Sequence, residues 1–202
     1  EYGVEPSYIE WFSGTQDGLQ RPSRIDFELP AGLVLHRMPI EQDMGPMLDS
    51  GELDAIISPN MPTSFTADPS PVRRLFPDYR ERERAFYLKT GIHPVMHTVV
   101  IREDLYDKRP WVAESLFTAC EQSKAWVLSQ MRHTGAQRYM FPWMFDEIAE
   151  MDELFDGNPF PYGLEPNRHL LETFMRYLVD QYFLSEPAAI DDLFAPMVSW
   201  RE

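Results

Sequence analysis

The chain has 202 residues, of which 44% are apolar and 25% charged, a balance typical of a folded globular protein. Its 33 acidic and 18 basic residues give a formal net charge of −15, which repels nucleic acids and anionic membrane surfaces, so neither is an expected partner. The single cysteine, Cys120, excludes an internal disulfide, and no apolar run approaches the roughly 18 residues of a membrane span.

The first part of the chain alternates segments typical of strands and of short helices. Strands are expected at residues 8–12 and 33–38, and a short helix is expected at residues 44–48, ending at Gly51. A third strand, apolar enough to be buried on both faces, is expected at residues 53–58. This alternation favours an α/β fold with a parallel or mixed sheet.

Polar residues after the third predicted strand are candidate ligand contacts. In α/β sheets, ligands bind outside the carboxyl ends of the strands, and Ser58, Asn60, Thr63 and Ser64 follow such an end. A proline-stiffened surface loop explains the same residues without a ligand.

Two residues in the first half of the chain are candidates to bind an anion or to transfer a proton. Arg74, beside Arg73, can hold a carboxylate in a bidentate fork or can belong to a solvated face. Residues 94–102 alternate like a strand, which places His97 among apolar neighbours as a core histidine or as a group that titrates near neutral pH. His93 and His97 would form a metal site only with a third ligand, and none stands at a suitable spacing, so no metal is predicted.

The second half of the chain is predicted to be helical. Pro110 opens a long helix to residue 131, whose inward stripe includes Leu116 and Val127, and a second helix is expected at residues 141–155. A third helix is expected to begin near Pro166, and a last short turn is expected at residues 190–194.

The start of the third helix holds several polar groups in five residues. Pro166 suits a first helical turn, where its missing N–H is not needed. The free N–H groups of that turn, with Arg168 and His169, make a plausible site for an anionic ligand. An ordinary helix start with solvated charges is the alternative.

Several segments together resemble one family. They are residues 51–58, 72–79, 90–97 and 162–169, with residues 1–6 at the start and 192–196 at the end. In this order they resemble the 4,5-dihydroxyphthalate decarboxylase family, whose fold is similar to that of type II periplasmic solute-binding proteins. The resemblance implies a type II periplasmic-binding-protein-like α/β fold, in which a mixed sheet is flanked by helices. It also implies that most of the first lobe is absent from this chain.

The same resemblance implies a division of the chain and an activity. Residues 1–102 would form a second-lobe α/β segment with a return strand at 94–102, and residues 103–202 would form a helical segment packing across the lobes. The implied activity is non-oxidative decarboxylation of 4,5-dihydroxyphthalate to protocatechuate, without a cofactor or metal. A carboxy-lyase of this kind is expected in the cytoplasm, with a small aromatic carboxylate as its partner, and it can be a homo-oligomer.

Within the resembling segments, the chemistry suggests roles for individual residues. Protonation of the ring carbon needs an acid, and activation of a ring hydroxyl needs a base. His97 is the candidate proton donor or relay, and Glu165 or His169 would orient or deprotonate the catechol. The candidate substrate contacts are Ser58, Arg74, Asn167 and Arg168. Among these, the guanidinium groups of Arg74 and Arg168 would each bind a carboxylate.

Two other classes of protein fit the same pattern. The first is a solute-binding protein of an ABC transporter for a small aromatic or anionic ligand, which would be periplasmic. A small-molecule sensor is the second, and no attached signalling domain is visible. The fold does not separate these classes, because function depends on the site. Motifs of nucleotide-driven chemistry, serine hydrolysis and structural zinc are absent from the sequence.

Overall fold

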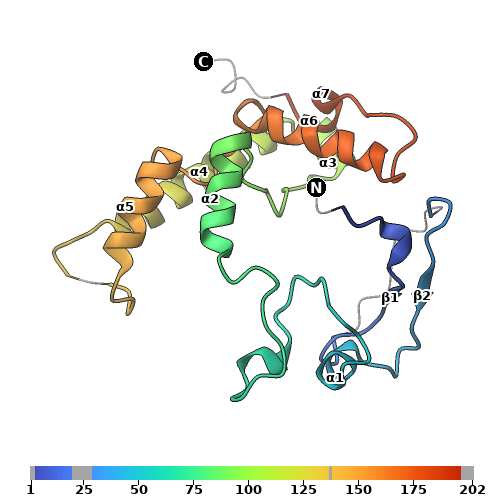
Figure 1. Cartoon of the computed structure of the whole chain (residues 1–202). Coiled ribbons are helices and arrows are strands. Elements are labelled where there is room, and N and C mark those ends of the chain that lie inside the picture. The colour runs from blue at the N-terminus through green and yellow to red at the C-terminus, as the bar shows by residue number, and fades with distance from the viewer. Residues whose placement is uncertain (1–2, 20–28, 137, 197–202) are drawn as a thin grey trace. The chain divides into compact units, whose positions relative to one another are not determined.

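The computed structural model describes residues 3–19, 29–136 and 138–196, and the chain forms two compact units (Figure 1). Unit 1 comprises Glu1–Tyr79 and Asp180–Ser185, and unit 2 comprises Arg80–Val179 and Glu186–Glu202. The boundary between the units differs from the division at 102/103 that the resemblance implies. That division and the periplasmic-binding-protein-like fold stay predictions, and residues 1–2 and 197–202 of the predicted segments lie outside the described part.

Unit 1 contains a small parallel sheet. Strand β1, Trp11–Ser13, pairs with β2, Leu35–Arg37, so that Trp11 lies opposite Leu35. A short 3-10 helix, η1, Pro6–Tyr8, precedes β1. Each strand overlaps a predicted strand but is shorter. The Phe12 and His36 rings of the paired strands stack at 4.9 Å, which adds side-chain contact to the ladder.

Helix α1, Met44–Ser50, follows the sheet as expected. The Asp43 side chain accepts a hydrogen bond from the Gly45 N–H and so caps the first turn. Gly51, in a left-handed conformation with φ 78°, ends the helix as predicted. A second 3-10 helix, η2, Thr63–Thr66, lies in the proline-rich loop.

The later part of the chain is helical. Helices α4, Trp111–Met131, α5, Met144–Phe155, α6, Leu164–Asp180, and α7, Ile190–Leu193, confirm the four predicted helical segments. Helices α2, Tyr79–Thr90, and α3, Glu103–Lys108, were not predicted. Among the described residues, the buried apolar side chains all lie on helices of unit 2: Ala113, Met144, Ile148, Leu164, Met175 and Ile190.

Some local predictions were wrong. Residues 53–58 and 94–102 form no strand in the described structure, because neither segment meets a second strand that would complete a hydrogen-bonded ladder. On α4 the inward face is also rotated from the predicted stripe. Ala113 is buried, whereas Leu116 and Val127 are 41% and 39% exposed. None of the helices among residues 3–19, 29–136 and 138–196 has the length and apolar character of a membrane-spanning helix.

Candidate functional site

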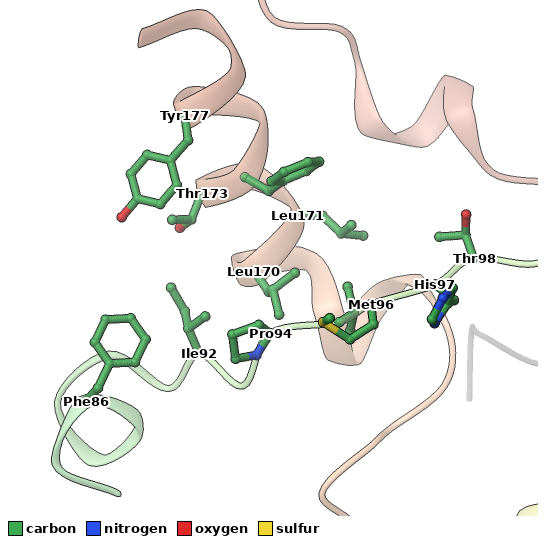
Figure 2. Close-up of a pocket in the computed structure, with 12 residues that line it drawn as sticks. Phe86, Ile92, Pro94, Met96, His97, Thr98, Leu170, Leu171, Thr173 and Tyr177 are labelled. Carbon is green, nitrogen blue, oxygen red and sulfur yellow. The ribbon is translucent and has the colours of Figure 1, made fainter. Parts of the chain in front are cut away.

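Unit 2 contains a groove of about 470 Å³ beside helix α6 (Figure 2). One wall is a face of α6, and the other is formed by Phe86 of α2 and the segment that follows this helix. The volume is in the range of small-molecule sites, and the walls are mainly apolar. The lining consists of Phe86, Ile92, Pro94, Val95, Met96, His97, Thr98, Leu170, Leu171, Thr173, Phe174 and Tyr177.

His97 is the predicted site residue that lines this groove. In Figure 2 it lies with Thr98 toward one end, while Phe86 and Tyr177 lie toward the other. The predicted strand would have buried His97 on an apolar face, but the segment is not a strand and the His97 side chain is exposed. An accessible imidazole beside apolar walls can exchange protons with a ligand in the groove.

Arg168, in the first turns of α6, donates hydrogen bonds to two carboxylates, one on α6 and one on α7. It donates to both oxygens of Glu165, at 2.6 and 3.2 Å, and to both oxygens of Asp191, at 2.7 and 3.2 Å. Hydrogen bonds from Arg168 hold the pKa values of Glu165 and Asp191 below their usual values, and these bonds raise the pKa of Arg168. A ligand carboxylate could use the fork of Arg168 only by replacing one of these partners.

Asn167 and His169 connect parts of unit 2. The Asn167 side-chain amide donates to the carbonyl oxygens of Pro161 and Gly163, at 2.7 and 2.8 Å, and so ties the preceding loop to α6. His169 Nε2 lies 3.0 Å from the carbonyl oxygen of Thr90, the last residue of α2. In this arrangement the two side chains support the groove without belonging to its described lining.

Ser58 and Arg74, the other predicted substrate contacts, lie in unit 1. Ser58 Oγ accepts a hydrogen bond of 3.1 Å from the Asn60 N–H. The Arg74 guanidinium lies over the rings of Phe65 and Tyr79, 5.2 and 4.6 Å from their centroids. These are cation–π contacts, which leave the N–H edge of a guanidinium available to an anion. The roles proposed for Ser58 and Arg74 stay predictions.

Sequence reasoning missed a polar corner of unit 1, built around Asp43. Its carboxylate accepts hydrogen bonds from the backbone N–H groups of Asp17, Gly18 and Gly45, at 2.8, 2.7 and 2.9 Å. Burial raises the pKa of this carboxyl, but the three donors outweigh burial and hold the pKa below its usual value. The Asp17-Gly18 pair is a turn signal in the sequence, but nothing local indicates that Asp43 would bond to it.

Two polar side chains attach this corner to the loop after residue 58. Gln16 Nε2 donates to Asp17 Oδ2 at 3.2 Å and to the Asn60 carbonyl oxygen at 3.3 Å. The Thr63 N–H also donates to Asp17 Oδ2, at 3.0 Å. The region that was predicted to contact a ligand therefore meets the turn that follows β1.

His93, one of the two histidines considered as metal ligands, lies among aromatic rings. His93 packs against the rings of Phe155 and Phe160, with centroids 4.9 and 5.0 Å away. Burial lowers the pKa of His93, and the charge of Glu83 opposes this shift. Within the described residues, no group of three or more His, Cys, Asp or Glu side chains could hold a metal ion.

Comparison with known proteins relates the chain to decarboxylases. No family model matches it. A curated protein of Comamonas testosteroni named 4,5-dihydroxyphthalate decarboxylase is 30% identical over 175 residues, which cover 87% of this chain and 53% of the relative. A protein of the same name from Pseudomonas putida is 33% identical over 78 residues, covering 39% of this chain and 30% of the relative. The chain thus spans about half the length of the first relative, and its similarity to these decarboxylases is at the family level.

Proposed function

We propose that this protein is an aromatic-acid decarboxylase whose substrate is 4,5-dihydroxyphthalate. The observation that carries the proposal is the sequence similarity to proteins of that name, which extends over 87% of the chain. An exposed imidazole in an apolar groove is a feature that such chemistry can use. The activity is a carboxy-lyase reaction that forms protocatechuate and carbon dioxide without oxidation.

The reaction has to avoid a free carbanion on the aromatic ring. Polarising or removing the proton of the hydroxyl para to the leaving carboxylate pushes electron density onto the carbon that bears this carboxylate. Protonation of that carbon then allows the C–C bond to break, and the ring regains its aromaticity as carbon dioxide leaves. The step needs a proton donor at the ring carbon and a base at the hydroxyl, and each such group typically contributes about 10²–10⁴-fold.

The groove in unit 2 offers surroundings suited to this step. Its apolar walls, which include Leu170, Leu171 and Phe174, can pack against an aromatic ring. Loss of carbon dioxide converts a charged carboxylate into a neutral molecule, so an apolar environment favours the product side of the step. His97 is the candidate proton donor in this lining.

Arg168 could bind the second carboxylate of the substrate after an exchange of partners. Glu165 is three residues earlier on the same helix, whereas Asp191 belongs to the separate helix α7 and its side chain is 71% exposed. Asp191 is therefore the partner that a substrate carboxylate would replace. Glu165 would remain to orient the guanidinium.

The direct test is incubation of the full-length protein with 4,5-dihydroxyphthalate. We expect release of carbon dioxide, with protocatechuate identified by chromatography, and no dependence on an added oxidant. Heat-inactivated protein is the control for spontaneous decarboxylation. Binding of the diacid without carbon dioxide release would contradict the proposal and would favour the solute-binding alternative.

The role of His97 can be tested separately. His97→Ala should lower turnover at least tenfold, since removing a general acid typically costs about 10²–10⁴-fold. His133→Ala is the matched control, because His133 is also an exposed histidine but lies outside the groove lining. Turnover should be measured for both variants after circular dichroism has shown unchanged helix content. Equal rates in the wild type and His97→Ala would remove His97 from the mechanism.

A further inference from the structure

The α6 wall of the groove in unit 2 contains a buried threonine, Thr173. Its side chain belongs to the groove lining and the residue is 7% exposed, whereas the other polar members of the lining, His97, Thr98 and Tyr177, are exposed. In Figure 2 Thr173 projects from α6 toward the side of the groove that carries Ile92. Among the residues that the structure describes, none forms a hydrogen bond with the Thr173 hydroxyl.

The Thr173 hydroxyl differs in this respect from other hydroxyl groups on the helices of unit 2. A threonine or serine inside a helix commonly donates its hydroxyl to a backbone carbonyl one turn earlier. Thr90 of α2 does so, with its Oγ1 2.7 Å from the carbonyl oxygen of Phe86. Ser129 of α4 likewise donates to the carbonyl oxygen of Trp126, at 2.7 Å. Because Thr173 makes no such bond within the described structure, its hydroxyl can both donate to and accept from a molecule in the groove.

We propose that Thr173 is a specificity-determining residue of the groove, and that its hydroxyl binds a neutral hydrogen-bonding substituent on the ring of the ligand. Unlike the fully buried Oε1 atoms of Gln16 and Gln130, the Thr173 hydroxyl is not sealed from solvent, so a ligand in the groove can reach it. The contact itself does not depend on the proposed decarboxylation, whereas its effect on that reaction rests on the proposed function.

The surroundings of Thr173 favour a neutral substituent over a charged one. The described lining contains no Lys or Arg, so a charged group beside Thr173 would lose part of its hydration without gaining an opposite charge. Leu170 and Phe174 present apolar surface on the same wall. A hydroxyl or carbonyl group can exchange a hydrogen bond to water for one to Thr173, which a methyl group cannot do. This wall therefore suits an apolar ring that carries a small neutral polar group.

The position of Thr173 also orients a bound ring. In Figure 2 His97 lies toward one end of the groove, while Tyr177, one turn after Thr173 on α6, lies toward the other. A ring whose substituent bonds to Thr173 therefore presents its opposite side to His97. In the proposed reaction, the hydroxyl para to the leaving carboxylate would be bound at Thr173, and the carbon that receives the proton would face His97.

Binding of two ring compounds of similar size tests the contact without requiring turnover. 4-Hydroxybenzoate carries a neutral hydroxyl where 4-methylbenzoate carries a methyl group. Their dissociation constants are measured from the shifts of the methyl NMR signals of Leu170 and Leu171 in the full-length protein. Thr173→Val, which exchanges the hydroxyl for a methyl group, should shift the ratio of the two dissociation constants roughly three- to tenfold in favour of 4-methylbenzoate, the effect of one lost hydrogen bond.

Two further variants make this test specific to the hydroxyl. Thr173→Ser keeps the hydroxyl and should retain the wild-type ratio. Thr118→Val removes an exposed hydroxyl on α4, outside the described lining, and should retain it as well. The proposal would be overturned by an unchanged ratio in Thr173→Val, by the same change in Thr173→Ser or Thr118→Val, or by the absence of any shift in the groove signals with either compound.

The kinetic consequence is measured with 4,5-dihydroxyphthalate. Thr173→Val should raise KM roughly three- to tenfold and change kcat less than twofold, because a bond made equally in the bound substrate and in the transition state affects binding alone. A fall in kcat at unchanged KM would contradict a binding role for Thr173. If the wild type releases no carbon dioxide, the proposed function fails, and the ratio of dissociation constants still decides the role of Thr173.

Discussion

At the scale of single residues, Arg168 joins two segments that are distant in the sequence. It holds Glu165, on its own helix, and Asp191, which lies 23 residues later on α7. Ile190, the neighbour of Asp191, is 8% exposed, so apolar burial and the ion pair act on the same short helix. A helix of four residues such as α7 is not stable alone and depends on these contacts.

The Arg168 contacts predict a pH dependence for the attachment of α7. The pKa values of Glu165 and Asp191 are lowered by the hydrogen bonds from Arg168, relative to ordinary values of 4.5 and 3.8. A lowered folded-state pKa gives stability that is complete above the ordinary values and is lost as the pH falls through the lowered ones. The protection factors of the α7 amides, which compare their exchange rates with those of an unstructured peptide at the same pH, should therefore fall below about pH 4.

Substitutions in α7 can separate this effect from general acid unfolding. Asp191→Asn should lower the protection of the α7 amides at neutral pH and make this protection less dependent on pH between about 5 and 2. Asp192→Asn removes a neighbouring acid of the same helix and serves as the control. Identical pH profiles for the two variants would show that the bond to Arg168 does not hold α7. The effect should be modest, because water screens exposed pairs.

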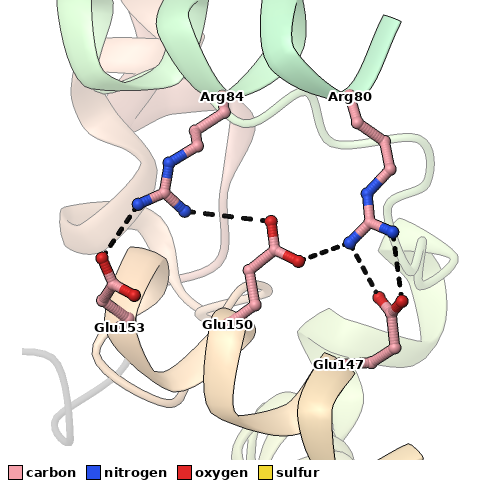
Figure 3. Close-up of polar contacts among 5 residues, drawn as sticks. All are labelled: Arg80, Arg84, Glu147, Glu150 and Glu153. Carbon is pink, nitrogen blue, oxygen red and sulfur yellow. Dashed lines mark hydrogen bonds and ion pairs between the residues drawn. The ribbon is translucent and has the colours of Figure 1, made fainter. Parts of the chain in front are cut away.

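At the scale of elements, a ladder of charges joins α2 to α5 (Figure 3). Arg80 donates to both carboxylate oxygens of Glu147, at 3.1 and 3.0 Å, and also bonds to Glu150. Arg84, one turn later, pairs with Glu153 at 2.9 Å and with Glu150 at 3.9 Å. Helix α2 has no buried residue, and besides this network the Tyr87 ring contacts the Phe155 ring of α5, with centroids 4.6 Å apart.

A double-mutant cycle can measure this link. Arg80→Gln, Glu147→Gln and the double variant should give a coupling free energy of about 0.5–1 kcal/mol, the upper range for exposed pairs, because the geometry is bidentate. The coupling should decrease in 1 M salt, where the screening length is about 3 Å. Arg102 and Asp104 form a comparison pair that is also bidentate but lies two residues apart and is more exposed, so its coupling should be smaller and shows the effect of exposure alone. A salt-independent coupling would indicate packing instead of charge attraction.

The same helices show what could be predicted from the sequence. Helix α4 was predictable because Pro110 precedes a long helical pattern, and α6 because a glycine and Pro166 mark its start. Helix α2 was missed because residues 79–90 are dominated by charges without a clear apolar stripe, and its partners on α5 are nearly 70 residues away. The alternation at residues 94–102 indicated a strand, but a strand also needs a partner that no local pattern reveals.

The site was predictable to a similar extent. His97 was identified from its residue type, and it lines the groove. The ion pair between Asp191 and Arg168 could not be predicted, because pairs between distant segments show no regular spacing in the sequence. Gln16 was missed for another reason: an amide has no charge or motif, and its role comes from a bond to the distant Asn60 carbonyl oxygen.

At the scale of the whole molecule, exposed apolar side chains and net charge have opposite effects on self-association. Large apolar side chains are exposed within unit 2, among them Trp111 and Trp126 on α4, each 62% exposed. Such surface favours association, while the net charge of −15 keeps copies of the chain apart.

Ionic strength should decide which of the two effects dominates. We expect the 202-residue chain to be mainly monomeric in 20 mM salt and to self-associate in 0.5 M salt, where repulsion is screened, as measured by sedimentation velocity. Trp126→Lys should reduce this association. The substitution makes the net charge less negative, which alone would increase association, so a decrease can come only from lost apolar contact. Association that weakens as salt is added would instead mean that ion pairs hold the copies together.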